Sequence, residues 1–310
     1  MKREKKILQI HPEDNVAIAV KMIQKGEEVK LGSGDIKAAE EIPRGHKIAL
    51  QAIEKGETII KYGNPIGRAT QNISDGQWVH SQNMETGLEG KLDYEYSPET
   101  DRDAPKEMAE DTFSGYQRTD GSVGTRNEIW VIPTVSCVNH AAEQIAGEAD
   151  KRFGGMCDGV FALPHNAGCS QLGTDHETAQ KILAGIIRHP NAGGVLVVSL
   201  GCENNNLKEF KPVLGDVDDS RVKFMIAQEE ENEVERGVEL IGKIAEKVSE
   251  DKRVPVPVSK LRIGFKCGGS DSLSGVTANP ACGKITDKVT AQGGISILTE
   301  VPEMFGAEQI

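Results

Sequence analysis

Long apolar runs and a dense set of cysteines are both missing from this sequence of 310 residues. No run approaches the roughly 18 to 20 uninterrupted apolar residues that a helix needs to span a bilayer. The N-terminal stretch MKREKKILQIHPEDN also lacks the long apolar core of a secretion signal. Six cysteines are too few for a disulfide scaffold, so we expect free thiols, metal ligands or catalytic groups in a reducing compartment. The sequence therefore predicts a cytoplasmic protein.

Positive charge is also in short supply. The chain has 36 Lys and Arg against 48 Asp and Glu, a formal net charge of -12, which works against binding nucleic acid or an anionic membrane through bulk electrostatics. Neither is expected as a partner, and an anionic substrate must be bound by a local cluster of positive groups. The glycine-rich stretch CGGSDSLSG at 267–275 fits neither GxGxxG nor GxxxxGK[ST], so nucleotide binding has no support from motifs.

The N-terminal region repeats a short phrase: IQKGEEV at 23–29, IEKGETI at 53–59 and ISDGQWV at 73–79. Each copy is typical of a turn that enters a strand, because glycine supplies a positive φ and the β-branched or aromatic residues after it suit a pleated surface. We therefore expect a small, mostly β domain over residues 1–88. The acidic stretch that follows contains Pro98 and Pro105 and shows no periodicity, which predicts a linker over 89–117.

From about residue 127 short apolar runs alternate with longer amphipathic segments. The expected strands are 129–135, 159–163, 194–200, 222–226, 261–265 and 295–298, and the expected helices are 138–152, 175–188, 204–213, 230–249 and 280–292. Most of these strands are apolar throughout, as in a parallel sheet that is covered on both faces. The fold class is therefore predicted as α/β, with an open, mainly parallel sheet domain over 118–310.

Turns rich in glycine, asparagine and cysteine follow the predicted strands. Four of the six cysteines lie in such turns: Cys137, Cys169, Cys202 and Cys267. Because the carboxyl ends of parallel strands point the same way, these cysteines are expected along one edge of the sheet. Three thiolates on separate loops could hold iron, or an iron–sulfur cluster with one open iron. No CxxC spacing favours this reading, and small residues are also needed in such turns for geometry alone.

Two histidines stand out in the predicted β domain. His46 lies between Arg44 and Lys47, a small basic cluster in an acidic protein that could receive a carboxylate, and His80 lies among polar residues in the stretch WVHSQN. A histidine that titrates near neutral pH suits acid and base work. The alternative for each is a hydrogen-bonded structural or surface side chain.

Several long strings carry a family resemblance. They are RGHKIAL at 44–50, KYGNPIGRA at 61–69, GSVGTRNEIWVIPTVSCVN at 121–139, GCSQLGTDH at 168–176, RHPNAGGVLVV at 188–198, LGCENN at 200–205, CGGSDSLSGVTANP at 267–280 and TEVPEMFGAEQ at 299–309. From residue 7 onward the chain resembles the altronate/galactarate dehydratase family, which also includes sulfolactate sulfo-lyase. The resemblance implies an N-terminal SAF domain of the β-clip type. It also implies that the family continues beyond the position of Ile310, so we expect an incomplete dehydratase domain.

The resemblance implies a bacterial hydro-lyase of hexuronate catabolism that converts D-altronate to 2-dehydro-3-deoxy-D-gluconate and water. It further implies dependence on Fe²⁺ or Mn²⁺, with an iron–sulfur cluster as the other cofactor considered. Position in the sequence then gives a hypothesis for the site. In it, His46 and His80 project from the SAF domain over the sheet edge as catalytic groups. The metal ligands are Cys137, Cys169 and Cys202, and the substrate is bound by Arg44, Lys47, Arg126, Asn139, His165 and Asn204.

Other classes of function stay open at this point. Within the enzymes, galactarate dehydratase and sulfolactate sulfo-lyase are the alternatives, because substrate choice depends on a few groups in the pocket. A non-catalytic module that binds a sugar acid or takes part in assembly would bind ligand without turnover. An iron–sulfur redox or sensor protein would show a chromophore and no dehydration. The sequence does not decide whether the chain forms a homo-oligomer.

Overall fold

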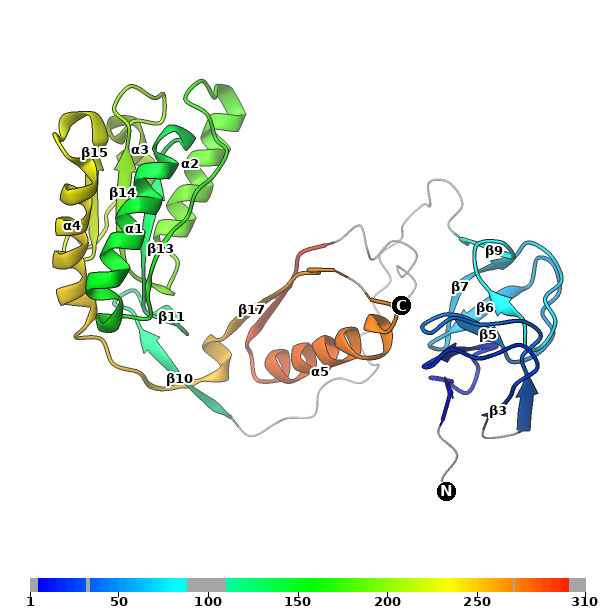
Figure 1. Ribbon diagram of the computed structural model, residues 1–310. Coiled ribbons are helices and arrows are strands. Elements are labelled where there is room, and N and C mark those ends of the chain that lie inside the picture. Colours follow the sequence, from blue (N-terminus) through cyan, green and yellow to red (C-terminus); the bar gives the residue numbers. More distant parts are fainter. Residues whose placement is uncertain (1–4, 32–33, 88–109, 270, 301–310) are drawn as a thin grey trace. The chain divides into compact units, whose positions relative to one another are not determined.

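The structure is a computed structural model that describes residues 5–31, 34–87, 110–269 and 271–300 (Figure 1). The chain divides into two compact units: Ala109–Leu261 form one, and Met1–Met108 with Arg262–Ile310 form the other. Among the helices that the structure describes, none combines the length and the apolar character that a bilayer crossing requires.

The N-terminal part is built of short antiparallel strands, as predicted. One sheet has the order β1 (Ile7–Leu8), β2 (Val16–Ala19), β5 (Lys47–Ala49) and β8 (Trp78–Val79); a second contains β6 (Thr58–Lys61), β7 (Asn64–Ala69) and β9 (Met84–Glu85); and β3 (Glu28–Leu31) pairs with β4 (Gly34–Lys37). The core beneath them is rich in isoleucine, valine and alanine, which pack well in the confined space between short strands.

The glycine turn of this part occurs four times, one copy more than the sequence repeat indicates. Gly26, Gly45, Gly56 and Gly76 all have a φ between 75° and 84°, and each backbone N–H donates to the carbonyl of an alanine in a neighbouring strand or directly after one. The four isoleucines that open the turns are buried and pair across isolated bridges, Ile23 with Ile42 and Ile53 with Ile73. The additional copy is IPRGHKI at 42–48, so His46 directly follows one of the four glycines.

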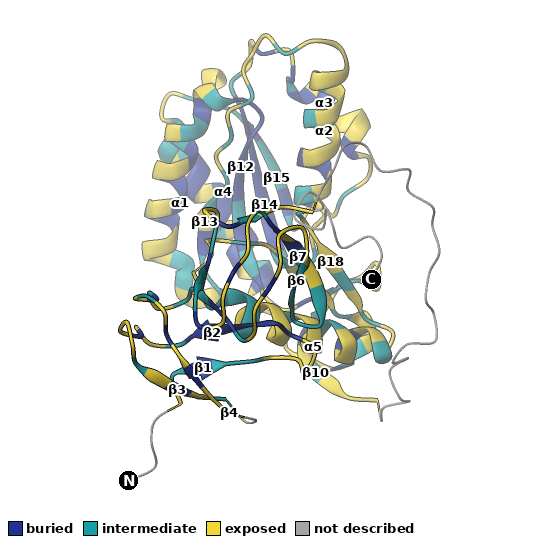
Figure 2. Cartoon of the chain, turned by 90° about the vertical axis from the view of Figure 1, so that its right-hand side faces the viewer, coloured by how far each residue is buried: buried dark blue, intermediate teal, exposed yellow. Residues whose placement is uncertain are grey.

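The second unit contains the parallel sheet that the sequence predicts, with the order β13 (Val160–Ala162), β12 (Glu128–Pro133), β14 (Ala192–Ser199) and β15 (Val222–Ile226). One face packs against α1 (Asn139–Phe153) and α4 (Glu233–Val248), and the other against α2 (Gly173–Ile187) and α3 (Leu207–Leu214) (Figure 1). Successive residues of β14 contribute to opposite cores, so all of the strand after Ala192 is buried (Figure 2). This is why its sequence is apolar throughout rather than alternating.

A small antiparallel sheet lies at the start of this unit. It consists of β11 (Val123–Gly124), β10 (Thr112–Gln117) and β16 (Val254–Pro257). The prediction of a linker over 89–117 was therefore wrong for its last six residues, because β10 pairs with β16, which lies far along the chain and has no strong strand pattern of its own. Most of the predicted linker, residues 89–109, lies outside the described residues.

The last described segment forms a separate element. Here β17 (Arg262–Phe265) and β18 (Ile295–Leu298) pair in parallel with each other, joined by α5 (Ala278–Ala291). The two strands were predicted at the right places, but the expectation that they extend the main sheet was wrong. The order of strands in a sheet is not encoded in the periodicity of each strand, so sequence could not place them. Short 3₁₀ turns complete the fold at Ser136–Val138, Gly154–Met156, Ala227–Glu229, Val258–Lys260 and Ser274–Val276.

We predict that Gly76→Ala destabilises the N-terminal part more than Gly56→Ala. Both glycines have a positive φ, which costs alanine about 1–2 kcal/mol. A Cβ at Gly76 would also collide with the carbonyl oxygen of Lys37, whereas one at Gly56 would meet open space. We expect a further loss of about 1–3 kcal/mol for Gly76→Ala.

The free energy of unfolding can be measured by urea titration. The chain has two tryptophans, so in a Trp130→Phe background Trp78 fluorescence reports on the N-terminal part alone. Equal losses for the two alanine variants would show that the collision is relieved by a backbone shift.

Candidate functional site

Three rings gather where β5 and β8 lie side by side in the N-terminal part. The ring centroids of His46 and Trp78 are 5.0 Å apart, those of His46 and His80 5.1 Å, and those of Trp78 and His80 5.4 Å. The indole N–H of Trp78 donates to Nδ1 of His46 at 3.1 Å. The two histidines that the sequence singled out are therefore neighbours, and the tryptophan beside them was not anticipated.

The charged groups near these rings are partly shielded from water. Burial lowers the pKa of His46, and the nearby His80 and Lys47 lower it further because each opposes a second positive charge. Burial also lowers the pKa of Lys47, as does the charge of Lys61. Two ammonium groups that oppose each other in this way would be stabilised by an anion, so this region suits a carboxylate.

Lys61 lies at a strained turn that the sequence analysis did not single out. Tyr62 and Gly63 form the two-residue turn between β6 and β7, and Tyr62 has a φ of 64°, unusual for a residue other than glycine, asparagine or aspartate. The buried carboxylate of Asp14 accepts the N–H of Gly63 at 2.8 Å and holds the turn. The ammonium group of Lys61 lies 4.6 Å from the centre of the Tyr62 ring. Backbone strain of this kind is often kept at binding sites.

In the second unit, loops that follow three parallel strands meet at one edge of the sheet. The N–H of Ser136 donates to the carbonyl of Ala167 at 2.9 Å, and the N–H of Asn204 to that of Cys169 at 3.3 Å. The side chain of Asn205 donates to Thr134 O at 3.1 Å. The loops carrying Cys137, Cys169 and Cys202 therefore lie along one rim, as predicted, and all three thiols are exposed. Cys267, by contrast, follows β17 and does not belong to this edge.

The centre of this rim is Glu203, which sequence reasoning missed as a site residue. Its side chain is 2% exposed and accepts hydrogen bonds from Thr134 Oγ1 at 2.6 Å, Ser199 Oγ at 2.5 Å, the N–H of Leu200 at 3.0 Å and the N–H of Gly201 at 2.6 Å. Burial opposes ionisation, but these donors outweigh it and hold the pKa of Glu203 below its ordinary value. An acidic residue directly after a buried strand, in the stretch LGCENN, was the available clue.

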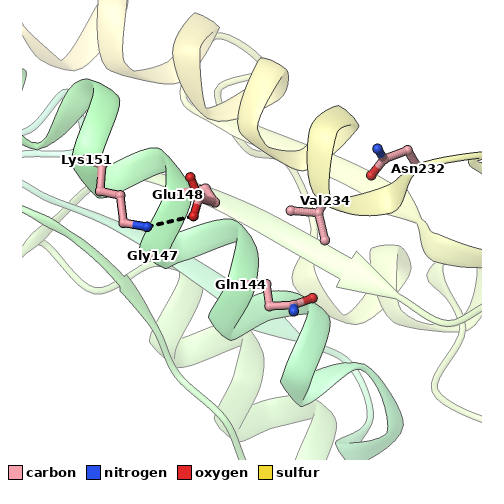
Figure 3. Close-up of a pocket in the computed structure, with 6 residues that line it drawn as sticks. All are labelled: Gln144, Gly147, Glu148, Lys151, Asn232 and Val234. Carbon is pink, nitrogen blue, oxygen red and sulfur yellow. Dashed lines mark hydrogen bonds and ion pairs between the residues drawn. The ribbon is translucent and has the colours of Figure 1, made fainter.

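An open groove of ≈ 570 Å³ lies at the same rim. Its lining residues come from the loops after β13 and β14 and from the first turns of the two helices that follow: Gln171, Leu172, Gly173, His176, Gly201, Cys202, Glu203, Asn204, Asn206 and Glu209. Polar groups dominate this lining, as expected of a site for a polyhydroxy ligand. A second groove lies on α1 and α4, lined by Gln144, Gly147, Glu148, Lys151, Asn232 and Val234 (Figure 3). It contains no histidine or cysteine.

Two of the predicted substrate-binding residues hold a loop through hydrogen bonds. Nδ1 of His165 accepts the N–H of Ala167 at 3.0 Å, so its Nε2 carries the proton and donates to Pro133 O at 2.9 Å. The side-chain amide of Asn139 donates to the carbonyl of His165 at 2.9 Å. Both side chains therefore fasten the loop after β13 to the start of α1, and a contact of either with substrate stays a prediction. Asn204 lines the groove and also donates to Gln171 O at 3.2 Å.

The remaining predicted residues are not brought together. Arg126 precedes β12 and so lies at the amino end of the sheet, opposite the rim, where it pairs with Glu128 at 3.2 Å. A strand of six residues separates the two edges by roughly 20 Å. Arg44 is an exposed residue of the N-terminal part, on the turn that precedes His46. The expectation that His46 and His80 project over the sheet edge concerns the relation between the two units and stays a prediction.

The predicted metal centre finds no ligand set in the part of the chain that the structure describes. There, no group of three or more His, Cys, Asp or Glu side chains is placed to hold a metal ion. The exposed thiols of Cys137, Cys169 and Cys202 share a rim without forming such a group. Cys157 is a packed side chain, and burial raises the pKa of its thiol. The residues described thus do not fit the metal as predicted.

Comparison with known proteins decides the family. The altronate/galactarate dehydratase SAF domain matches residues 5–87, the second domain of D-galactarate dehydratase/altronate hydrolase matches 115–249, and the C-terminal domain of D-galactarate/altronate dehydratase matches 258–310. The chain belongs to the altronate/galactarate dehydratase family. The N-terminal β part is thus the SAF domain of this family, and the four glycine turns are features of that domain.

Individual members of the altronate/galactarate dehydratase family are similar over nearly the whole chain. Altronate dehydratase of Bacillus subtilis (strain 168) is 49% identical over 308 residues, 99% of this chain and 62% of the relative. Altronate dehydratase of Escherichia coli (strain K12) is 46% identical over 305 residues, which are 98% of this chain and 61% of the relative. Galactarate dehydratase (L-threo-forming) of Escherichia coli (strain K12) is 32% identical over 315 residues, 97% and 60%. The chain therefore spans about three fifths of the length of these relatives.

We predict that Glu203→Gln destabilises the second unit by about 2–3 kcal/mol at neutral pH, because an amide cannot accept at both ends from four donors. Since the pKa of Glu203 is lowered on folding, the stability that its carboxylate supplies is fully present above the unfolded value near 4.5 and is lost as the pH falls through the folded value. The gap between the variant and the parent should therefore narrow below pH 4.5.

Urea unfolding followed by Trp130 fluorescence in a Trp78→Phe background measures this unit alone. The exposed Glu231→Gln removes the same charge and should change stability by less than about 0.5 kcal/mol. A loss for Glu203→Gln no larger than that of Glu231→Gln would show that the carboxylate does not organise the rim.

Proposed function

We propose that the chain carries the dehydratase activity of altronate dehydratase, the conversion of D-altronate to 2-dehydro-3-deoxy-D-gluconate and water. The observation that carries this proposal is the pair of imidazoles of His46 and His80, 5.1 Å apart, beside the partly buried ammonium group of Lys47. The identity of 49% and 46% to two altronate dehydratases supports the choice of substrate. We place the reaction in the cytoplasm, as the sequence predicts.

The chemistry explains why two imidazoles and a cation suit the task. Dehydration removes a weakly acidic proton from carbon 2, beside the carboxylate, and breaks the bond between carbon 3 and its hydroxyl. The electron pair of the carbon–hydrogen bond forms the double bond, and the proton leaves with the hydroxyl as water. The resulting enol becomes the 2-keto acid when carbon 3 takes up a proton and the 2-hydroxyl loses one. No oxidant or reductant is needed.

Different side chains of the SAF domain suit the binding of the carboxylate and the removal of the proton. Lys47 and Lys61 are placed to bind the carboxylate, because an anion relieves the repulsion between them. One imidazole takes the proton from carbon 2 while the other donates a hydrogen bond to the oxygen on which negative charge develops. Each of these contributions is worth roughly 10²–10⁴-fold in rate.

We propose that altronate is preferred to galactarate, since galactarate dehydratase is 32% identical where altronate dehydratase is 49%. Galactarate carries a second carboxylate, which would need a further cation. An assay of 2-keto acid formation with D-altronate, galactarate and sulfolactate separates the three activities. Faster turnover of galactarate or sulfolactate than of D-altronate would overturn this choice.

Replacing His46 or His80 by alanine should lower kcat for D-altronate by roughly 10²–10⁴-fold, because each removes a group that acts on the reacting atoms. His11→Gln changes a histidine of the same domain that lies outside the three-ring cluster, and it should leave kcat within about twofold. Steady-state rates of 2-keto acid formation measure both. Near-normal turnover in either alanine variant would remove that residue from the mechanism.

The Fe²⁺ or Mn²⁺ implied by the family resemblance stays a prediction, and the steps above are written through side chains alone. When bound, such a metal would supply a Lewis acid for the carboxylate and the neighbouring hydroxyl. Metal analysis after anaerobic purification tests it. If the rim thiols are ligands, Cys137→Ser, Cys169→Ser and Cys202→Ser together should abolish bound iron, and the packed Cys157→Ser should not. Equal iron content in both proteins would show that the rim thiols are not ligands.

A further inference from the structure

The four glycine turns of the SAF domain differ at the residue that follows the glycine. In three of them this side chain closes the turn by accepting the N–H of the residue three positions earlier. Glu27 accepts from Gln24 at 3.1 Å, Glu57 from Glu54 at 2.8 Å and Gln77 from Ser74 at 2.6 Å. In the fourth turn the equivalent residue is His46.

His46 has no such task, because the residue three positions earlier is Pro43, which has no N–H to donate. Its ring is instead directed to Trp78 and His80. In three copies the side chain after the glycine accepts a hydrogen bond that closes the turn. In the fourth copy His46 makes no such bond, which indicates that its side chain serves another purpose.

Trp78 is itself firmly placed. Its backbone N–H donates to Oε1 of Glu40 at 3.1 Å, and its carbonyl accepts from the side-chain amide of Asn83 at 2.8 Å. Its position in β8, opposite Ile48 in the register with β5, fixes the direction of the indole. The 3.1 Å hydrogen bond to His46 therefore comes from a donor that the surrounding strands hold in place.

An indole N–H can only donate, so Nδ1 of His46 must offer a lone pair. The proton of the neutral ring is then on Nε2. A cationic ring would carry a second N–H at Nδ1, directed at the N–H of Trp78. The charged groups that act on His46, His80 at the end of β8 and Lys47 on β5, also disfavour the cation, and burial lowers the pKa of His46 further.

We propose that Trp78 is a positioning residue that holds His46 as the neutral tautomer with its proton on Nε2. His46 then presents a hydrogen-bond donor to an oxygen of the bound carboxylate, and His80 is the group that takes the proton from carbon 2. The division of roles rests on the proposed function, whereas the tautomer of His46 does not. A neutral imidazole is a suitable donor here because it stabilises developing charge without itself giving up a proton.

Trp78→Phe tests the tautomer directly, since it keeps an aromatic ring and removes the N–H. The ¹⁵N and ¹H shifts of the His46 ring, followed by NMR over a pH titration, report which nitrogen is protonated and at what pH. In the parent protein we expect a neutral ring protonated on Nε2. In Trp78→Phe we expect a mixture of tautomers and a rise in the pKa of His46, because the cation no longer meets an opposing N–H at Nδ1. Unchanged shifts and an unchanged titration would overturn the proposal.

Two controls keep this test decisive. Trp130→Phe removes the other indole N–H of the chain, which donates to Glu128 in the second unit, and should leave the His46 titration unchanged. If Trp78→Phe does not fold, Trp78 can be replaced by its benzothiophene analogue, which keeps the bicyclic shape and lacks the N–H. That variant should give the same shift, and failure to do so would overturn the proposal.

Conservative variants test the roles of the two histidines. Glutamine offers an N–H donor but no base, so His46→Gln should retain at least roughly tenfold more kcat than His46→Ala. His80→Gln should be no better than His80→Ala. If His80→Gln retained more activity than His80→Ala and His46→Gln did not exceed His46→Ala, His80 would be the donor and His46 the base, which would overturn the proposed division of roles. If the NMR result holds while no aldonate is dehydrated, the tautomer stands and the proposed function fails.

Discussion

The hydrogen bonds between four glycine N–H groups and four alanine carbonyls are the constraint on which the SAF domain depends. Each turn needs a positive φ at its glycine, and each opens with a buried isoleucine that pairs with another copy. The chain is thereby folded back on itself at short intervals, so that side chains far apart in sequence become neighbours. His46 and His80 meet for this reason, one directly after the second turn and the other at the end of the strand that follows the fourth.

In the second unit a buried carboxylate, that of Glu203, holds segments together that lie far apart in the sequence. Three loops end at one rim of the sheet, and Glu203 joins two of them by accepting hydrogen bonds from Thr134, directly after β12, and from Ser199 and Gly201 at the end of β14. A buried carboxylate is tolerated because every donor around it points inward. His165 and Asn139 fasten a neighbouring loop through hydrogen bonds as well. The groove at this rim thus has rigid walls although it is made of loops.

Much of this fold could be predicted from the sequence, because local patterns decide local structure. The buried strand β14 was recognisable by its unbroken apolar run, and α4 by its helical periodicity. What could not be predicted depends on partners distant in the chain. Strand β10 was taken for linker because its partner, β16, lies more than a hundred residues later, and β17 and β18 pair only with each other.

At the site, too, features that depend on neighbouring residues could be predicted, and features that depend on distant residues could not. The basic cluster around His46 and the thiols at the rim could be found from neighbouring residues alone. Trp78 could not, since its place beside His46 depends on the register between β5 and β8. Neither could the strained turn at Tyr62, which is held by Asp14 from the loop before β2. Arg126 was placed at the site from its position in the sequence, yet a residue directly before β12 lies at the amino edge of the sheet, opposite the rim.

A structure of the protein with D-altronate bound would test the proposed chemistry most directly. We expect a carboxylate oxygen within hydrogen-bonding distance of Nε2 of His46, the ammonium groups of Lys47 and Lys61 close to that carboxylate, and carbon 2 directed toward the ring of His80. A substrate bound with both imidazoles beyond reach of its first three carbons would contradict the assignment of His46 as the hydrogen-bond donor and of His80 as the base.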